Sequence, residues 1–503
     1  LDPATPEKYR SYILQGVEDW QEAFEEAGFK NAIVAKLPPS PEEDPDWSPE
    51  DIRYSTVRWV ASEIRNAVGP SVSDPRSGEI IESDIVWYHN HMRSYRNRLM
   101  IETGAANPAA RALQLDDDLI GETMRRVISH EVGHALGLPH NMQSSSAYPV
   151  DSLRSGTFTQ KYGIATTIME YARQNYVAQP GDEGIRFIRQ IGPYDLYSIN
   201  WGYRVIPGAD SPEQEKPVLD SWIEAKAGDP VYRFASSTGY DPSAQTEDLS
   251  DDPVKASGYG LANLKRVVPN LLEWTATDGQ GFDDLAEIYG ELIGMWSRYA
   301  RHVATNIGGV YQNRIASDQD GVVYTPVDPG YQRQAMAFLV EHAFSTPDWL
   351  LDTQILQRIE HAGAVERIQR LQSGVLGAVM NPAVVHRLSE QAALQPEAYE
   401  PLEMLEDLRQ GVWSELYEGG AIDAFRRALQ RSYLERAAGV FDPEAGGSRM
   451  DVAGSDVPAF VRTELEQIRR DAERAAGRTS DAATRAHLRD VAARVDQILD
   501  PMD

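Results

Sequence analysis

Three histidines and one glutamate lie within eleven consecutive residues of this chain, at His130, Glu131, His134 and His140. Side chains four residues apart stand on the same face of an α-helix, so His130 and His134 can direct their imidazoles at one point. Their separation suits zinc, whose bonds to histidine nitrogen are roughly 2.0–2.1 Å long. Glu131 lies beside that point, where a carboxylate can take a proton from a metal-bound water whose pKa the zinc has lowered to about 7. The spacing therefore indicates zinc-assisted hydrolysis, of a peptide bond for example.

The chain after the second histidine supports a third metal ligand. We expect the helix to end at Gly137, because glycine adopts the left-handed conformation easily and Pro139 cannot easily resume a helix. This turn brings His140 back toward the other two imidazoles. Three protein ligands with an open fourth position are typical of a catalytic zinc site. Ordinary helix histidines are the alternative, but the full HExxHxxGxxH pattern rarely occurs by chance.

This signature resembles that of the metzincin clan of zinc metalloendopeptidases, in which a Met-turn follows. Met169, in the segment Thr-Thr-Ile-Met-Glu-Tyr, lies where that turn is expected. The resemblance implies that Met169 forms a hydrophobic base under the imidazoles, which is compatible with a role as a core residue. It also implies that Tyr171 can reach the zinc and stabilise an oxyanion. The alternative is a packed tyrosine whose hydroxyl bonds a backbone carbonyl. Asn141 follows the third histidine, whereas several branches of the clan carry Asp, Glu, Ser or Pro there, so this residue assigns the chain to no standard branch.

Four further strings resemble a large bacterial family of exported zinc-dependent metalloproteases with a helical C-terminal region. They begin at Glu18, Gly69, Tyr148 and Asn175. The resemblance implies a secreted, periplasmic or cell-envelope location and a further N-terminal domain upstream. Because the chain begins with Leu1 and carries no signal peptide, we expect it to be a processed piece of a longer protein.

Composition narrows the classes of partner. A chain of 503 residues is long enough for two or three domains, each with its own core. The formal net charge of −29 disfavours nucleic acid and anionic membranes as partners, because their phosphates would be repelled. The absence of cysteine excludes disulfides and thiolate metal sites. No apolar run approaches the ~20 residues of a membrane span.

The predicted fold class is α+β. Residues 1–205 are expected to form a metzincin-like catalytic domain, with a twisted mixed sheet, a backing helix and the active-site helix. A loop-rich acidic linker or insertion is expected over residues 206–255 and a mainly helical domain over residues 256–503. Within the catalytic domain, periodicity and turn residues predict helices over 6–27, 93–111, 116–137 and 192–203, and strands over 31–37, 52–60 and 80–88. One of these strands should be the edge that pairs with an extended substrate.

Two further groups of residues are candidate metal ligands. His89 and His91 would share one face of a strand, which allows a second metal site or a role in lining the cleft, although partly exposed structural histidines are the commoner case. A candidate structural Ca²⁺ site is offered by clustered carboxylates, but their spacing matches no EF-hand and a solvated acidic linker explains them better. These carboxylates are Asp241, Glu247, Asp248, Asp251 and Asp252.

These patterns favour a zinc-dependent endopeptidase that acts on protein or peptide substrates. His130, His134 and His140 would hold one Zn²⁺, Glu131 would activate the water, and Tyr171 would assist. A binding or adhesion protein that retains a metal site is an alternative from another class, although the intact Glu131 argues against it. A zinc hydrolase of cell-wall peptides would use the same residues.

Overall fold

The computed structural model describes residues 1–441, 452 and 454–500, and the chain divides into two compact units. The first unit contains residues 1–238 and 243–276, and the second contains residues 239–242 and 277–503. The first unit is therefore longer than the catalytic domain expected over residues 1–205. The extra chain is part of its core, since the buried Asn263 side-chain amide donates hydrogen bonds to the carbonyl oxygens of Tyr176 and Ala178.

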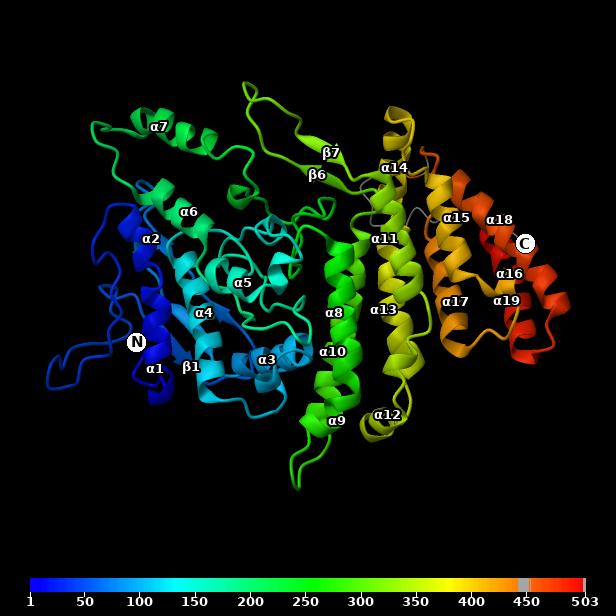
Figure 1. Cartoon of the computed structure of the whole chain (residues 1–503), viewed down its shortest axis with the longest axis horizontal. Coiled ribbons are helices and arrows are strands. Elements are labelled where there is room, and N and C mark those ends of the chain that lie inside the picture. The colour runs from blue at the N-terminus through cyan, green and yellow to red at the C-terminus, as the bar shows by residue number, and fades with distance from the viewer. Residues whose placement is uncertain (442–451, 453, 501–503) are drawn as a thin grey trace. The chain divides into compact units, whose positions relative to one another are not determined.

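The first unit contains a small mixed sheet, against which its core packs (Figure 1). Its strand order is β1 (Val57–Val60), β5 (Ile85–Tyr88) and β2 (Ala67–Val68). β1 runs parallel to β5, and β2 runs antiparallel to β5 at one edge. A separate hairpin joins β3 (Val72–Ser73) to β4 (Ile80–Glu82). The sheet is thus mixed, as predicted, with its antiparallel strand at an edge.

None of the three predicted strands has its predicted extent, and of residues 52–60 only β1 (Val57–Val60) is a strand. Residues 31–37 form no strand, because side chains of the preceding helices bind backbone N–H groups that a sheet would need. Gln21 accepts from the N–H of Ile33, and Glu18 accepts from that of Ala35. The strand predicted over residues 80–88 is divided into β4 and β5. At the division Ser83 Oγ donates to the carbonyl of Pro70, and this contact turns the chain away from a continuous strand.

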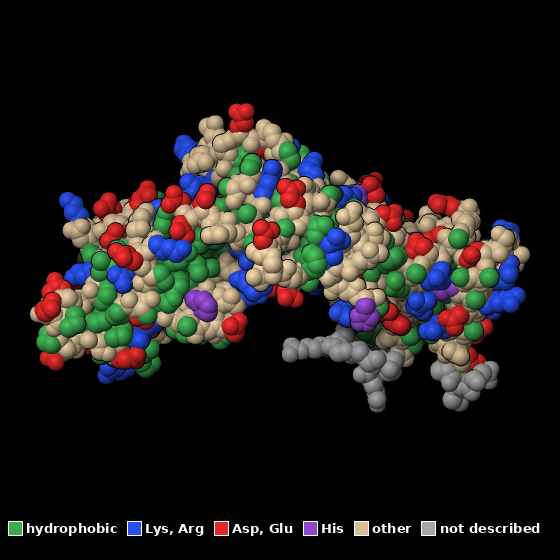
Figure 2. Space-filling model, turned by 90° about the horizontal axis from the view of Figure 1, so that it is seen from below, with side chains coloured by type: hydrophobic (Ala, Val, Ile, Leu, Met, Phe, Trp, Pro, Cys, Tyr) green, Lys and Arg blue, Asp and Glu red, His purple; other side chains and the backbone are tan. Residues whose placement is uncertain are grey.

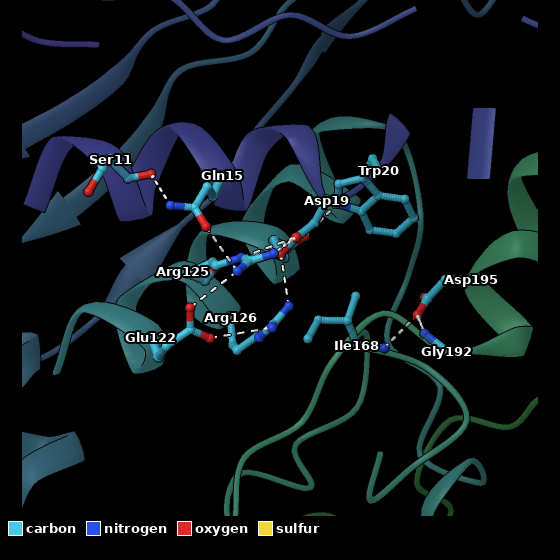
Figure 3. A network of polar contacts seen from close by, with 11 residues as sticks. Ser11, Gln15, Asp19, Trp20, Glu122, Arg125, Arg126, Ile168, Gly192 and Asp195 are labelled. Atoms are coloured by element: carbon cyan, nitrogen blue, oxygen red, sulfur yellow. Dashed lines mark hydrogen bonds and ion pairs between the residues drawn. The ribbon is translucent and has the colours of Figure 1, made fainter. Parts of the chain in front are cut away.

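The backing helix is broken at Asp19 into α1 (Glu7–Glu18) and α2 (Gln21–Glu26), although periodicity predicted one helix. Asp19 accepts from Arg125 at 2.5 Å, from Arg126 at 3.0 Å and from Ser129 Oγ at 2.6 Å, all on α4 (Asp117–Ala135). Figure 3 shows this carboxylate between the helices and Trp20 beside it. Trp20 Nε1 donates to the carbonyl of Ser129 at 2.8 Å. The break therefore fixes α1 against the helix that carries the HExxH motif.

One apolar core lies between α1, α4 and the sheet. It includes Ile13, Trp20, Trp87, Ile128 and Met169, all of them buried. Burial of side chains of this size stabilises a fold by roughly 1.5–3 kcal/mol each. Figure 2 shows that other hydrophobic side chains remain at the surface of this unit, at the left of that view.

The remaining helices of the first unit surround this core. The helix predicted over residues 93–111 begins at α3 (His91–Arg98), continues as a π-helix (Leu99–Thr103) and then ends. The other α-helices are α5 (Gly156–Tyr162), α6 (Pro193–Tyr203), α7 (Pro212–Glu224), α8 (Pro253–Val267) and α9 (Leu271–Trp274). Short 3-10 turns occupy Pro108–Ala110, Ser145–Ala147, Ser152–Arg154, Pro230–Tyr232 and Val268–Asn270.

The segment expected to be a solvated acidic linker is partly buried. Asp248 is 1% exposed, and the N–H of Ser250 donates to the carbonyl of Ser145. Asp251 accepts from the N–H of Val150. Residues 248–251 therefore pack against residues 145–150, and for these residues the expectation of a solvated linker was wrong. Sequence composition missed this because the acidic side chains have polar partners far away along the chain.

The second unit is mainly helical, as predicted. Its α-helices are α10 (Asp283–Ala304), α11 (Pro329–His342), α12 (Thr353–Ile359), α13 (Ala364–Val379), α14 (Pro382–Leu394), α15 (Pro401–Val412), α16 (Glu415–Glu418), α17 (Ala424–Ala438), α18 (Val457–Arg478) and α19 (Ala482–Leu499). A hairpin of β6 (Val310–Gln312) and β7 (Tyr324–Pro326) and a 3-10 turn at Asp348–Leu350 complete it. In the described part of the chain, no helix has the length and apolarity needed to cross a membrane.

Candidate metal centre

α4 and the turn after it bring three imidazoles together. Gly137 has a φ of 85°, so the chain leaves the helix there and returns His140 toward His130 and His134. The Nε2 atom of His140 lies 3.2 Å from Nε2 of His130 and 3.0 Å from Nε2 of His134. Two nitrogen ligands of a tetrahedral zinc ion are about 3.3 Å apart when each bond is about 2.05 Å. Both distances are close to that value, and the ligand atoms of all three histidines lie within 4.8 Å of one another, as a shared zinc ion would require.

The opposite ring nitrogens decide which tautomers are present. Nδ1 of His130 lies 2.7 Å from the carbonyl oxygen of Ile168, and Nδ1 of His134 lies 2.8 Å from that of Leu138. A carbonyl only accepts hydrogen bonds, so both Nδ1 atoms carry the proton and both Nε2 atoms present lone pairs. Lone pairs that converge in this way need a cation between them. Within the described residues, this is the only group of three histidine or acidic side chains that could hold a metal ion.

The three imidazoles are held in the neutral form that metal ligation requires. Burial lowers the pKa of His130 well below its ordinary value, and the charge of Arg189 lowers it further. Burial and the neighbouring His134 lower the pKa of His140 to about 4. The pKa of His134 is also lowered by burial.

Met169, the residue expected in a Met-turn, is buried against α4. It is 2% exposed and packs against Gly133, where a Cβ atom would come within 2.2 Å of its sulfur. Its carbonyl accepts from the N–H of Asn141, which ties the turn to the residue after the third histidine. Asn141 also donates from its side chain to the carbonyl of Arg233.

Asp195 holds the same turn from α6 and was not singled out by its sequence. Its buried carboxylate accepts from the N–H groups of Ile168 and Gly192, each at 2.8 Å, and from Thr167 Oγ1 at 2.5 Å. Figure 3 shows the contacts with Ile168 and Gly192. Because the carbonyl of Ile168 orients His130, Asp195 supports the metal centre indirectly. Its position in the first turn of the predicted closing helix was the signal that could have identified it.

Glu131 faces the cleft beside the imidazoles and is 7% exposed. Burial raises its pKa to about 7, against the charges of Arg189 and Arg173 and a hydrogen bond from the backbone of Gly69. A Cβ atom at Gly69 would lie 2.4 Å from the carbonyl oxygen of Glu131, so only glycine permits this approach of the β2 end to α4.

Tyr171 packs against the ligand set. The centroid of its ring lies 4.4 Å from that of His140 and 5.6 Å from that of His130, and the Arg173 guanidinium lies 4.6 Å above its ring. Its hydroxyl makes no hydrogen bond with any part of the described chain, so the expected alternative of a bond to a backbone carbonyl is not present. The hydroxyl is therefore available to a ligand in the cleft.

The cleft has a volume of about 380 Å³ and is lined by the triad, by Glu131 and by residues 66–70 at the β2 edge. His91 also lines it, although it was expected on a strand with His89. β5 ends at Tyr88, and His91 begins α3, so the two histidines do not share a strand face. His89 Nδ1 accepts instead from the N–H of Ser62. Burial lowers the pKa of His91 to about 4.

Two arginines of the cleft, Arg173 and Arg189, carried no recognisable sequence signal. Arg173 Nε donates to Glu247 at 2.9 Å, and Glu247 also pairs with Arg98 at 3.1 Å. Among the described residues, the carboxylates proposed for calcium do not form a metal-binding group. Glu247 is engaged in ion pairs instead, and the expectation of a calcium site is not supported.

Comparison with known proteins gives one match. A family model described as Met-zincin matches residues 112–420, a range that includes all three histidines, Met169 and Tyr171. No curated protein and no solved structure matches the chain.

Proposed function

Because this chain belongs to the Met-zincin family and so to the zinc metallopeptidases, we propose that it is an endopeptidase with His130, His134 and His140 as its zinc ligands. The observation that carries the proposal is the convergence of three Nε2 atoms beside a buried carboxylate in a cleft. A structural zinc site would close all four positions with protein ligands, whereas here the fourth side opens to the cleft.

The β2 edge is the proposed docking line for the substrate. β2 pairs with β5 on one side only, and its residues line the cleft next to the triad. An extended peptide can add to such an edge through backbone hydrogen bonds. We propose Ala67–Val68 as this edge strand, which lies outside the three strands that the sequence predicted.

The proposed chemistry needs two side chains besides the ligands. Zinc at the triad would polarise the scissile carbonyl and lower the pKa of water to about 7. Glu131 takes a proton from the attacking water and delivers it to the leaving amine. The Tyr171 hydroxyl, which has no partner in the described chain, donates a hydrogen bond to the oxyanion that develops on the carbonyl oxygen.

A secreted or periplasmic location is also proposed, and it rests on the family resemblance of the sequence strings alone. We further propose that the helical second unit has no part in the chemistry, since the residues that line the cleft all belong to the first unit.

The test is zinc content together with cleavage of casein by wild type, Glu131→Gln and Tyr171→Phe. We expect one zinc per chain in all three, no cleavage by Glu131→Gln, and a kcat reduced about 10²-fold for Tyr171→Phe with little change in KM. Zinc without cleavage of casein or of a peptide library would contradict the endopeptidase proposal. A parallel assay on cell-wall peptides would then separate a cell-wall hydrolase from a binding protein.

A further inference from the structure

Arg189 is a buried guanidinium without a carboxylate partner. The residue is 3% exposed, and its Nη1 donates to the carbonyl of Glu170. In the described part of the chain it forms no ion pair. Arginine is almost never fully buried unless it is paired, because removing its charge from water is costly. A buried, unpaired arginine that lines a cleft therefore points to an anionic ligand.

The carboxylates near Arg189 form no ion pair with its guanidinium. In Glu170 only Oε2 is hydrogen bonded, and it accepts from Ser144 Oγ at 2.7 Å and from the N–H of Ser145 at 2.8 Å; the buried Oε1 has no hydrogen-bond partner among the described residues. Asp195 is bound by the Met-turn, as described above. Glu131 faces the metal centre. These carboxylates contribute to the field at Arg189, but none of them contacts it.

The charge of the cleft is opposite to that of the whole chain. The chain carries a net charge of −29, yet the cleft lining contains Arg173 and Arg189 and a single carboxylate, Glu131. Arg173 is engaged by Glu247 and by Tyr95, so Arg189 is the cation left for a ligand. The lining also includes Val127, one turn before His130 on α4, so the cleft extends beyond the metal centre along that helix.

We propose that this cleft binds a carboxylate of the substrate and that Arg189 pairs with it. The inference rests on the proposed peptidase function and adds a substrate class to it. Two sources of the carboxylate fit the site: an Asp or Glu side chain next to the scissile bond, or the C-terminal carboxylate of a peptide. The planar guanidinium suits both, because it can form two parallel hydrogen bonds with the two oxygens of one carboxylate.

Cleavage of matched peptides distinguishes the two sources. One pair differs only by Glu or Gln at the residue that follows the scissile bond, and a second pair ends in a free carboxylate or an amide. We expect kcat/KM to be about 10- to 100-fold higher for the acidic member of one pair. In Arg189→Met the preference should disappear, and in Arg189→Lys part of it should remain. Arg186→Met is the matched control, since Arg186 lies three residues earlier and does not line the cleft.

Binding without turnover is the second readout. Isothermal titration of the zinc-loaded Glu131→Gln chain with the same peptides should show the same order of affinity as kcat/KM in the wild type. If peptides are cleaved but neither the acidic side chain nor the free C-terminus is preferred, the carboxylate proposal is overturned and the peptidase proposal stands. If nothing is cleaved but acidic peptides bind more tightly, the peptidase proposal fails and the carboxylate site remains. The wild-type comparisons decide the question even if Arg189→Met does not fold.

Discussion

A methyl group added at position 133 tests how the active-site helix is supported. A Cβ atom there would lie 2.2 Å from the sulfur of Met169 and 2.8 Å from Cζ2 of Trp20. Carbon atoms normally make contact at about 3.5–4.0 Å, so in Gly133→Ala both side chains must move by roughly 1 Å or more. Neither can retreat into solvent, because both are buried and Trp20 is hydrogen bonded to Ser129.

The change in the free energy of unfolding caused by Gly133→Ala is the sum of two opposing contributions. Overpacking of this kind costs about 1–3 kcal/mol, and replacing glycine by alanine inside a helix returns about 1 kcal/mol. With two buried groups in the way, we expect Gly133→Ala to lower the free energy of unfolding of the first unit by about 2 kcal/mol. Displacement of Met169 also moves the neighbouring carbonyl of Ile168, which binds Nδ1 of His130. Loss of such outer contacts weakens metal binding about 10- to 100-fold.

Denaturant titration of the zinc-free chain measures the free energy of unfolding, and competition with a chromophoric chelator measures the zinc affinity. Gly202→Ala is the matched control, because Gly202 lies in α6 of the same unit with open space around its Cα. That variant should keep its zinc affinity and gain up to about 1 kcal/mol. The packing argument is refuted if Gly133→Ala behaves like Gly202→Ala in both measurements.

Three other perturbations have defined outcomes. Asp19→Ala should lower the free energy of unfolding by about 3 kcal/mol in denaturant titration, since it removes the buried carboxylate shared by Arg125 and Arg126 and leaves both with only the more exposed Glu122. Asp117→Asn is the control: it removes an exposed ion pair with Lys8 and should lower the free energy of unfolding by less than about 1 kcal/mol. Equal losses in the two variants would contradict a stabilising role of Asp19. The unfolding midpoint should rise with the concentration of free zinc and fall when zinc is chelated, because zinc binds the folded chain. In His134→Ala, calorimetry should find no dependence of the midpoint on zinc. Burial lowers the pKa of His487 from 6.5 to about 4, so the unfolded chain binds more protons in that range. The free energy of unfolding should therefore fall by up to about 3 kcal/mol as the pH falls from 6.5 to 4, and a profile unchanged in His487→Gln would exclude His487 as the cause.

The metal centre was largely predictable from short stretches of sequence because its geometry is local. The spacing of His130 and His134 within one helix, and the positive φ at Gly137 that returns His140, involve contacts within eleven residues. Helical periodicity and the special backbone freedom of glycine govern contacts at that range. The same holds for the start of α6, because Pro193 suits the first turn of a helix that the family resemblance predicted there.

Elements that depend on distant partners were not predictable in this way. The break at Asp19 arises from arginines 106 and 107 residues away, and their ion pairs outweigh the apolar periodicity that predicted a continuous helix. The strand expected over residues 31–37 is absent because side chains of earlier helices bind its backbone. Local propensity is worth only tenths of a kcal/mol per residue, so a buried charge contact from elsewhere in the fold can reverse it.

Which residues line the cleft beyond the histidine motif depends on contacts between segments that are distant in the sequence. Arg189 lies 59 positions after His130 in a segment without regular periodicity, and no pattern in its neighbours marks it as part of the cleft. β2 became the edge strand only through its pairing with β5. Which side chains face a cleft is set by how separate segments pack, because their positions relative to one another depend on the sum of many contacts across the core. A short run of sequence encodes which of its own faces is apolar, but not which distant segment will cover that face.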